Sequence, residues 1–519
     1  MAIYLNTSKP YESYKELVNS RYFVDKSNII EELNERISTN DKYVCITRPR
    51  RFGKSSIINM LGAYYSKAVD SSDIFNELEI SKNRKYRGNL NKYNVIKIDF
   101  SDLPDESFEY SEYINRIRNN IEKDLLKFYP NIPFDKTSSL SDKFHSTEAK
   151  FIFIFDEWDF IFNRGLFEEN HNNFLEFLRL LLKDKPYVAL AYMTGILPIK
   201  KHSSGSALNM FEEFTFLKDR KFEEYFGFTE EEVRDLCIKN KNMKYQELER
   251  WYNGYMTATG LKIYNPRSVV LALSNNYCQS YWTNTGAMDE VLECLKYNIL
   301  EVRDDVIKMV NGEEVEIEID EEYRAGQGQP RTREEIYSAM IVLGFLSYYE
   351  GLVKIPNNEL MKEFKKALVD ESFGEVSKIV KSSEIMLKAT VKGDNETVIK
   401  ILHEVHNSEI PILKYNDENS LSCVITLAYL YARNTYRIER EEWSGKGFVD
   451  FSFHPRRNRD IPFIIELKKD ESVDVALNQI KEKEYALKFK KEYKDRDVLA
   501  VAICYNSKTK EHSCKIERI

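Results

Sequence analysis

Phe151 to Asp159 read FIFIFDEWD, an apolar run followed at once by acidic residues. A continuous apolar run, rather than an alternating one, is typical of a parallel β-strand that is covered on both faces. Such a strand delivers Asp156 and Glu157 at its carboxyl end. The plainer interpretation makes Asp156 a helix cap, but two carboxylates directly after a buried strand are what a Mg²⁺ site beside a nucleotide needs. The stretch therefore predicts the acidic half of a nucleotide site.

The segment Arg48 to Ser56 reads RPRRFGKSS and follows another apolar run, Tyr43 to Thr47. A Walker A loop needs backbone amides around the phosphates, a lysine that reaches the β- and γ-phosphates, and a hydroxyl for Mg²⁺. Gly53, Lys54 and Ser55 supply these parts. Alone, GKS also fits an exposed loop lysine beside a helix-capping serine. Together with the acidic strand, a Walker B strand in this interpretation, it predicts a P-loop NTPase.

The predicted nucleotide site has three roles for its residues. Glu157 is expected to orient or deprotonate the attacking water as a catalytic residue, and Ser55 and Asp156 are expected to hold Mg²⁺. Arg48 stands where the Walker A pattern has its first glycine, which restricts the turn. The arginines at positions 48, 50, 51 and 220 are all candidates to stabilise transferred phosphate, and the sequence leaves the choice open. The residues expected to contact ATP are Arg50, Arg51, Phe52, Gly53, Lys54, Ser55, Ser56, Asp156 and Thr194.

Further apolar runs complete a predicted α/β sheet with helices on its faces. Val95 to Phe100 and Tyr187 to Tyr192 are expected strands, and Phe174 to Leu182 carries apolar residues at helical spacing. The last of these strands leads directly to Thr194. If that strand inserts between the two strands of the nucleotide site, Thr194 faces the γ-phosphate as a sensor. Otherwise it is a threonine in a strand-end turn.

The composition indicates a folded, multidomain protein. The chain has 519 residues, which is long for one hydrophobic core. Its formal net charge of -8 argues against a protein that coats nucleic acid with its whole surface, although a local basic groove stays open. No apolar run reaches the roughly eighteen residues that a membrane helix needs. We therefore expect no membrane partner and a cytoplasmic or intracellular location.

The stretch after residue 225 is mostly helical in pattern and is expected to form a lid. Within it, Phe345 to Pro356 (FLSYYEGLVKIP) is typical of a β-hairpin that turns near Glu350 and Gly351. Because it follows a helix directly, it resembles the wing of a winged helix. Asn311 to Glu335 is acidic and weakly periodic, so it is the best candidate for an exposed insertion or a charged hairpin.

The last part of the chain has the pattern of a separate αββαβ domain. Its elements are expected at Leu421 to Ala432 (helix), Gly447 to Phe453 (strand), Pro462 to Leu467 (strand), Val473 to Lys488 (helix) and Val498 to Cys504 (strand). The first strand contains Asp450, and the second leads into Glu466 and Lys468 through the sequence IIELK.

These three residues predict a second catalytic site. The period of two places Glu466 and Lys468 on one face, with Asp450 able to oppose them across the ladder. Asp450 and Glu466 would hold one or two Mg²⁺ or Mn²⁺ ions, while Lys468 positions or activates the water that attacks a phosphodiester. The plainer interpretation is a solvent-facing ion pair, but buried strands seldom end in a glutamate and a lysine on one face.

The motifs together resemble the AAA-ATPase-like proteins that carry a C-terminal PD-(D/E)XK nuclease-superfamily domain, a family that commonly has arginine at the first Walker position. The resemblance implies an ASCE-type P-loop core at 1–225, a winged-helix-like lid at 226–375 and a small restriction-endonuclease-like α/β domain at 376–519. It implies no secure substrate. The matching segments cover nearly the whole chain and include YFVDKS at Tyr22 to Ser27, RPRRFGKS at Arg48 to Ser55, FDEWD at Phe155 to Asp159, WYNGY at Trp251 to Tyr255, GFVDF at Gly447 to Phe451 and IIELK at Ile464 to Lys468.

The leading hypothesis is an ATPase whose nucleotide state controls a Mg²⁺-dependent, nucleic-acid-cleaving domain. The alternative is a nucleotide-dependent switch or assembly platform whose nuclease fold is inactive and binds nucleic acid or protein. Nucleic acid is a candidate partner in both, and the sequence leaves DNA against RNA open. A homo-oligomer also stays open, because an arginine donated in trans would imply a ring or a dimer.

Overall fold

The computed structural model divides the chain into two compact units, one of residues 1–287 with 316–360 and one of residues 288–315 with 361–519. The residues that the structure describes are 2–103, 109–132, 138–199, 207–281, 300–310, 312–319, 322–328, 330, 332–368, 375–407, 418–457, 459–493 and 496–519.

The first unit is built on a five-stranded sheet in which every neighbouring pair is parallel. Its order is β2-β3-β4-β1-β5, so β4 lies between the phosphate-loop strand β1 and the acidic strand β3. This is the ASCE arrangement, and it confirms the predicted P-loop fold class. β5 was not predicted. The strands are β1 (Tyr43–Thr47), β2 (Asn94–Asp99), β3 (Phe151–Asp156), β4 (Val188–Gly195) and β5 (Glu212–Phe214).

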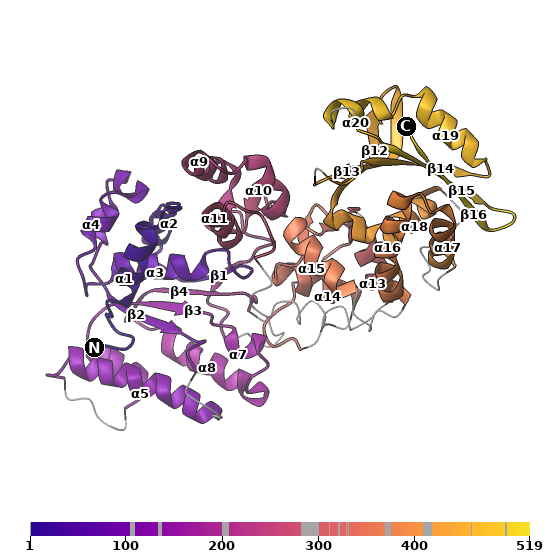
Figure 1. Ribbon diagram of the computed structural model, residues 1–519. Helices are drawn as coiled ribbons and strands as arrows, with labels where there is room; N and C mark the ends of the chain where they lie inside the picture. The colour runs from indigo at the N-terminus through magenta and orange to yellow at the C-terminus, as the bar shows by residue number, and fades with distance from the viewer. Residues whose placement is uncertain are drawn as a thin grey trace. The chain divides into compact units, whose positions relative to one another are not determined.

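Helices cover both faces of this sheet (Figure 1), with α1 and α3 on one face and α5 and α8 on the other. In α8 one face is buried, as the helical spacing predicted, and Leu180 is the exposed exception. The buried residues are Phe174, Leu175, Phe177, Leu178, Leu181 and Leu182. β1, β3 and β4 are buried along their whole length, which agrees with their continuous apolar sequences. The helices are α1 (Lys9–Val18), α2 (Ile29–Asn34), α3 (Lys54–Tyr65), α4 (Ser72–Phe75), α5 (Tyr110–Phe128), α6 (Leu140–Ser146), α7 (Phe160–Asn163) and α8 (His171–Leu182).

The next part of the first unit is helical and begins with capped helices. Thr229 and Glu232 form a capping box at the start of α9, and Asn265 caps α11, whose first residue is Pro266. A small sheet of order β6-β8-β7 lies among them. The elements are β6 (Phe228–Thr229), α9 (Glu230–Asn240), α10 (Tyr245–Tyr252), β7 (Tyr255–Met256), β8 (Lys262–Tyr264) and α11 (Pro266–Asn275).

The predicted hairpin after a helix is confirmed. β10 (Ser347–Tyr349) and β11 (Leu352–Lys354) pair antiparallel directly after α14 (Arg333–Val342). Glu350 and Gly351 form the turn, and both have positive φ, at 49° and 81°. Two successive residues with positive φ match the right-handed twist of the flanking strands, which is why this turn uses a glycine. The neighbouring elements are α13 (Leu300–Val310), β9 (Val315–Glu316) and α15 (Asn358–Leu368).

The stretch of residues 311–335, expected as an exposed insertion or a charged hairpin, is exposed only in part, since Glu314, Glu316, Glu318 and Glu334 are exposed while other residues are buried. Glu322 is only 2% exposed and accepts a hydrogen bond from the Thr215 hydroxyl. Arg324 pairs with Glu213 at 3.0 Å and donates to the carbonyl of Ile199 at 2.6 Å. Glu322 and Arg324 therefore lie inside, because they meet partners that are distant in the sequence.

The second unit contains a mixed five-stranded sheet of order β12-β13-β14-β15-β16. β14 and β15 are parallel and the other neighbours are antiparallel. Helices α19 and α20 lie on one side of it and α16 to α18 on the other (Figure 1). The elements are α16 (Glu375–Lys392), α17 (Asn395–His406), α18 (Glu418–Ala428), β12 (Tyr436–Ser444), β13 (Gly447–Pro455), β14 (Phe463–Lys469), α19 (Val473–Glu482), α20 (Ala486–Glu492), β15 (Leu499–Asn506) and β16 (Glu511–Arg518).

The predicted strands of this domain are confirmed as β13, β14 and β15, but both edge strands were missed. β12 (YRIEREEWS) and β16 (EHSCKIER) are rich in charged residues and only partly buried. Edge strands carry such residues because one side of the strand has no neighbour, so they lack an apolar run. Within the described residues, no helix is both long and apolar enough to cross a membrane.

Candidate active sites

The phosphate loop joins β1 to α3 at the carboxyl edge of the parallel sheet. Gly53 precedes α3 with φ of 90°, and Arg51 has φ of 71°. A Cβ at Gly53 would meet nothing within 4 Å, so its left-handed backbone, rather than lack of space, favours glycine there. α3 begins at Lys54, and the amides of its first turn have no partner within the helix. The loop thus offers the amides that a phosphate group needs.

Lys54 lies at the centre of this loop. Its side chain is buried, and Nζ donates to the carbonyl oxygens of Arg48 and Pro49, each at 3.0 Å. Burial lowers the pKa of Lys54, while the carboxylates of Asp159, Glu157 and Asp156 act in the opposite direction. The ammonium is therefore within electrostatic reach of the acidic end of β3, where a Mg²⁺-nucleotide would lie.

Carboxylates from two strands meet at this edge. Asp156 at the end of β3 is directly paired in register with Asp99 at the end of β2. Burial raises the pKa of Asp156 to about 6, Asp99 adds to the rise, and a hydrogen bond with Ser55 opposes it. Ser55 and Asp156 are thus in contact, as shared Mg²⁺ ligands would be. Sequence reasoning missed Asp99, although its strand sequence VIKIDF places an aspartate after apolar residues.

Glu157 has an unusual backbone for its residue type. Its φ is 48°, in the left-handed region, and its amide donates to Asp156 Oδ1 at 3.1 Å. This conformation costs a non-glycine residue about 1 kcal/mol, and such residues concentrate at functional sites. Burial raises the pKa of Glu157, while Lys54 lowers it. The carboxylate is therefore partly desolvated and within electrostatic reach of Lys54.

Thr194 lies on the strand that the sensor prediction required. β4 does insert between β1 and β3, and Thr194 is fully buried. Its hydroxyl donates to the carbonyl of Ile46 on β1 at 2.7 Å. The proton of this hydroxyl is therefore engaged in linking two strands, which leaves only its lone pairs for other contacts.

Asp159 holds the loop that follows β4 at this edge of the sheet. Its carboxylate accepts hydrogen bonds from the amides of Ile196 and Leu197, at 2.8 to 3.2 Å. A Cβ at Gly195 would come within 2.2 Å of Asp159 Oδ1 and 2.8 Å of the Trp158 ring. Only glycine permits this approach, so DEWD and TGIL form one packed unit. Sequence reasoning gave no role to Asp159.

Arg48 is not directed at the phosphate site. Only 1% exposed, it forms a buried ion pair with Asp219 and donates to the carbonyl of Phe214 at 2.9 Å. Its guanidinium also lies 4.8 Å from the ring centre of Phe226. The expected restriction of the turn at Arg48 does not arise, since its φ is not positive. Arg48 was a candidate for phosphate stabilisation, but its side chain instead links the loop to β5 and the segment that follows it.

We expect Arg48→Met to lower the free energy of unfolding of the first unit by about 3–5 kcal/mol, because it leaves Asp219 buried without its partner. Urea unfolding of the full chain, followed by circular dichroism, measures this. Arg220→Met, at the exposed neighbouring position, is the matched control and should change little. Equal stability of the two variants would contradict the structural role of Arg48.

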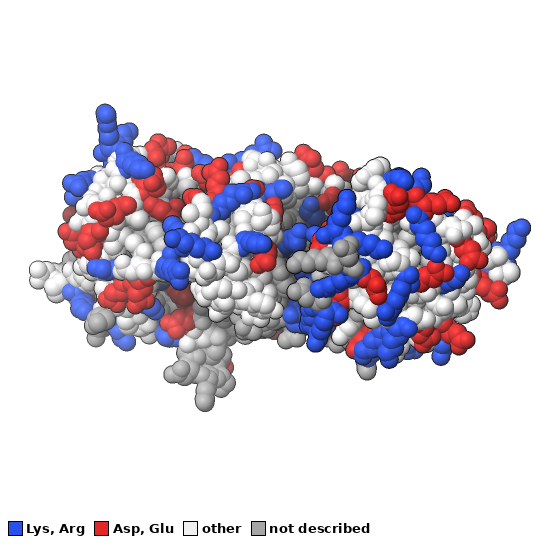
Figure 2. Space-filling view, turned by 45° about the horizontal axis from the view of Figure 1, so that its top comes forward, with Lys and Arg blue, Asp and Glu red and all other residues white. Residues whose placement is uncertain are grey.

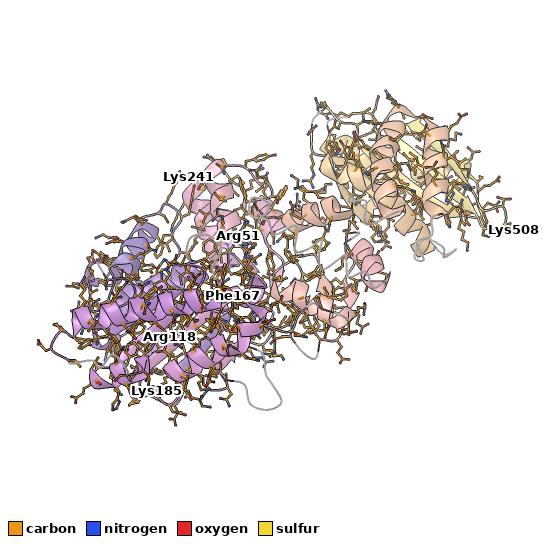
Figure 3. The ribbon with its side chains drawn as sticks, turned by 90° about the horizontal axis from the view of Figure 1, so that it is seen from below. Arg51, Arg118, Phe167, Lys185, Lys241 and Lys508 are labelled. Atoms are coloured by element: carbon orange, nitrogen blue, oxygen red, sulfur yellow. The ribbon has the colours of Figure 1, made fainter. Side chains whose placement is uncertain are left out.

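The remaining arginines of the loop, Arg51 and Arg50, have different interactions. Arg51 donates to the carbonyl of Tyr281 at 2.8 Å, and it lies where the core meets the helical part of the first unit (Figure 3). Phe52 packs edge-on against Tyr255, with ring centres 5.1 Å apart, and its carbonyl accepts from Gly227. Arg50 lowers the pKa of Glu157 and of Lys54. Arg50 is thus the loop arginine that interacts electrostatically with the acidic edge.

A second group of charged residues lies where β13 and β14 meet. Asp450 Oδ2 accepts from the backbone amide of Leu467 at 2.6 Å. Glu466 Oε1 accepts from Lys468 Nζ at 3.2 Å and from the side-chain amide of Gln479 on α19. Asp450, Glu466 and Lys468 therefore come together as their strand spacing predicted, and they are only partly open to solvent.

Glu466 fits the chemistry of a metal ligand. It is 2% exposed, and among the described residues its second oxygen, Oε2, is buried without a hydrogen-bond partner. Burial raises the pKa of Glu466 to about 7, with Asp450 adding to the rise and Lys468 opposing it. Burial would lower the pKa of Lys468, but Glu466 and Asp450 raise it overall. A buried, unsatisfied carboxylate oxygen beside a second carboxylate is suited to Mg²⁺.

A further polar cluster on the same sheet was not foreseen, because β12 was not predicted. Glu442 Oε2 lies 2.8 Å from His454 Nε2, and Lys488 pairs with the other oxygen. Burial would raise the pKa of Glu442, but hydrogen bonds from Lys488 and His454 lower it to about 2. Glu439 completes a group whose ligand atoms lie within 4.8 Å. Because a lysine already neutralises Glu442, the cluster is a charge network that ties α20 to the sheet.

Each candidate site falls in a segment that matches a known family. Residues 11–204 match the family described as a predicted AAA-ATPase, and residues 416–513 match the PD-(D/E)XK nuclease superfamily. The first match contains Lys54, Asp156 and Glu157, and the second contains Asp450 and Glu466. The two predicted sites therefore belong to two separately matched domains.

Individual proteins are more distantly similar. An uncharacterized protein from the vnfD 5' region of Azotobacter chroococcum mcd 1 is 23% identical over 286 residues, 53% of this chain and 52% of that protein, so about half of that relative is matched. A Walker-type ATPase of Pyrococcus abyssi has a TM-score of 0.33 at 14% identity, covering 66% of this chain and 94% of that one. The ORC1 protein of Aeropyrum pernix, in complex with DNA, has a TM-score of 0.28 at 11% identity, covering 69% and 96%.

Proposed function

Because this chain carries a domain of the predicted AAA-ATPase family and a domain of the PD-(D/E)XK nuclease superfamily, we propose that it hydrolyses ATP and that its nucleotide state controls metal-dependent cleavage of nucleic acid. The observation that carries the proposal is that two separate sets of catalytic side chains converge, each at one place in its own sheet.

In the first site the loop amides and Lys54 bind the β- and γ-phosphates, and Ser55 and Asp156 hold Mg²⁺. The Ser55–Asp156 hydrogen bond supports this shared ligation. Mg²⁺ would neutralise charge that develops on the phosphates. Glu157 orients the attacking water, and its strained backbone beside Lys54 supports that role. Asp99 keeps the edge acidic, and Arg50 is the favoured loop arginine for the γ-phosphate.

In the second site Asp450 and Glu466 hold Mg²⁺ or Mn²⁺, which would polarise the scissile phosphate. Lys468 positions the attacking water, and its bond to Glu466 Oε1 supports this. Gln479 donates to the same oxygen, which would leave Oε2 available to hold the metal. Such outer partners orient a ligand and raise metal affinity.

Contacts of the phosphate loop within the first unit supply the first step of a physical route for control. Arg51 and Phe52 of the phosphate loop contact Tyr281, Tyr255 and Gly227 in the helical part of the first unit. A change of loop conformation on nucleotide binding would therefore reach the helical part of the first unit, which belongs to the stretch of residues 226–375 that we propose acts as the lid. A two-state element biased by the nucleotide is what such control requires.

The test is incubation of the full chain with single- and double-stranded DNA and RNA, with and without ATP, in Mg²⁺ or Mn²⁺, beside Asp450→Ala. Cleavage that ATP alters and Asp450→Ala abolishes is the expected result. ATP hydrolysis with no cleavage of any form would favour the second candidate function, a nucleotide-dependent switch whose nuclease fold binds nucleic acid or protein. The acidic net charge of -8 is the observation that favours this candidate.

Metal binding at the second site is expected to depend on pH. Because the pKa of Glu466 is raised to about 7, the carboxyl is largely protonated below pH 7 and the metal must displace a proton. Apparent Mg²⁺ affinity should therefore rise between pH 6 and pH 8 and level off above, by about tenfold per pH unit at most. Calorimetry in buffers of different ionisation enthalpy measures the proton release. Glu466→Gln should remove it, and pH-independent affinity in the unaltered chain would contradict the assignment.

A further inference from the structure

Three histidines gather where helix α17 packs against the edge strand β16 of the second unit (Figure 1). His403 and His406 come from α17, and His512 comes from β16. His406 Nδ1 lies 3.1 Å from His512 Nε2, so the two rings share one hydrogen bond. The ring centres of His403 and His512 are 6.4 Å apart. Three of the seven histidines in the chain are therefore close neighbours.

The local structure directs these side chains toward one another. His403 and His406 are three positions apart, and residues at that spacing lie on one face of a helix. On β16, His512 is the direct ladder partner of Tyr505 on β15. The ring centre of Tyr505 lies 4.4 Å from that of His406 and 4.9 Å from that of His512. This packing positions both imidazoles before a ligand arrives, which lowers the entropic cost of binding one.

The pair of His406 and His512 is buried but incompletely hydrogen-bonded. His406 is 8% exposed and His512 is 7% exposed. One of the two facing nitrogens carries the proton of their shared bond, whichever tautomers are present. Among the described residues, His512 Nδ1 is buried without a hydrogen-bond partner. A buried polar group that is left unsatisfied calls for an explanation, and a bound ion is one of the usual ones.

Both rings of this pair are uncharged at neutral pH. Burial lowers the pKa of His512 to about 3, and His406 and His403 act in the same direction. Burial also lowers the pKa of His406, with His403 adding to the effect. Neutral imidazole is the form that binds a metal ion, because the metal takes the lone pair that a second proton would occupy. The two rings therefore carry no extra proton that a cation would have to displace.

The distances suit Zn²⁺. In tetrahedral sites Zn²⁺ binds imidazole nitrogen at about 2.0–2.1 Å, which places two such nitrogens roughly 3.3 Å apart. The 3.1 Å between His406 Nδ1 and His512 Nε2 is close to this separation, so the rings would turn more than they would move apart. His403 is exposed and can turn toward the pair. Its Nε2 accepts from the side-chain amide of Asn407 at 2.8 Å, and the exposed Asn407 can exchange that bond for water.

We propose that His403, His406 and His512 form a Zn²⁺ site that joins α17 to β16, with water in the fourth position. Three protein ligands and a water are a usual set for zinc. Imidazole nitrogens suit Zn²⁺ and related transition metals, whereas Mg²⁺ and Ca²⁺ prefer oxygen ligands. The site is therefore chemically distinct from the carboxylates of Asp450 and Glu466, and it does not depend on the function proposed above.

Zn²⁺ bound elsewhere on the protein sets the background of the test. On the face drawn in Figure 2, acidic residues are scattered among basic ones rather than gathered into one patch. Scattered carboxylates bind Zn²⁺ only weakly, but Asp450 with Glu466 is a second place where the ion could bind. The histidine variants are therefore made in the Asp450→Asn chain and compared with it.

The test is Zn²⁺ binding to the full chain carrying Asp450→Asn, stripped of metal with a chelator and measured by equilibrium dialysis with elemental analysis. One Zn²⁺ per chain is the expected result. His403→Ala should weaken binding by at least the roughly tenfold to a hundredfold that loss of an outer partner costs. His406→Gln and His512→Gln should remove it. His145→Ala, at an exposed position on α6, is the matched control and should change nothing.

Co²⁺ gives a second readout that does not depend on activity. Bound in place of Zn²⁺, it should show the visible absorption of a tetrahedral site, and the three histidine variants should lose this absorption. Circular dichroism of the metal-free variants separates loss of a ligand from loss of the fold. His403→Ala should fold as the unaltered chain does, because its side chain is exposed.

Three results would overturn the proposal. Zn²⁺ that binds equally well to His403→Ala and His406→Gln would belong to another part of the chain. Binding in the unaltered chain that vanishes in Asp450→Asn would assign the ion to the carboxylates. Binding no stronger than the surface background would leave the three histidines as a packed aromatic cluster only.

Discussion

Lys54→Ala is expected to reduce ATP hydrolysis by on the order of 100-fold or more, the loss typical of removing a preorganised group that stabilises transition-state charge. Lys54 is the buried ammonium of the phosphate loop, and its contacts in the structure are the carbonyl oxygens of Arg48 and Pro49. When a nucleotide binds, we expect the ammonium to exchange its hydrogen bonds with these two carbonyl oxygens for contacts with the phosphates. Steady-state phosphate release measures the hydrolysis, and a fluorescent ATP analogue measures nucleotide binding.

A second variant separates binding from chemistry. Glu157→Gln keeps the shape of the side chain but removes its charge, so nucleotide binding should persist while hydrolysis is lost. Lys67→Ala, an exposed lysine just beyond α3, is the control for removal of a lysine and should behave as the unaltered chain. If Lys54→Ala hydrolyses ATP normally, the phosphate loop has been assigned wrongly.

Asp450→Asn is expected to abolish cleavage of nucleic acid, again by on the order of 100-fold or more, because a neutral amide cannot hold the metal as a carboxylate does. The variant should fold, since an amide oxygen can still accept from the Leu467 amide that now bonds to Asp450. Cleavage of a labelled single strand in Mg²⁺ is the measurement. ATP hydrolysis should be unchanged, because that chemistry lies in the other domain.

The control for this variant is another carboxylate of the same domain. Asp474 on α19 is largely exposed and paired with Lys515 at 2.9 Å, so Asp474→Asn should cleave normally. Lys468→Ala should lose cleavage yet retain Mg²⁺ affinity, since Lys468 is assigned to the water rather than to the metal. Cleavage that survives Asp450→Asn would show that the nuclease fold is inactive and that the activity comes from elsewhere.

The candidate catalytic residues could be singled out from the sequence because their signals are local. The stretch FIFIFDEWD predicts a buried strand that ends in acidic residues, and IIELK predicts a buried strand that ends in a glutamate and a lysine in the second domain. Burial along a strand and the position of its end depend on neighbours in the sequence. The hairpin at Glu350 and Gly351 was equally local, since its turn needs positive φ.

The edge strands were not predictable in this way. β12 carries charged residues at positions where a central strand would be apolar, so its sequence has no strand signal. Because β12 was not predicted, the network of Glu442, His454 and Lys488 was not predicted either. The pairing of Trp443 with Phe448 was missed for the same reason. Side-chain partners across a ladder depend on register, which a single strand sequence does not carry.

By itself, then, the sequence determined the strands and turns of two candidate sites: a phosphate loop with an acidic strand, and a D…ExK pair of strands. Only the tertiary structure decided how the supporting residues are used. Arg48 meets Asp219 across 171 positions, Asp99 stands beside Asp156 through strand register, and Glu322 is buried beside Thr215. The physical reason is the separation along the sequence between the residues that interact. Strand ends and turns follow from neighbouring residues, whereas the partner of a buried charge is chosen by packing between distant segments.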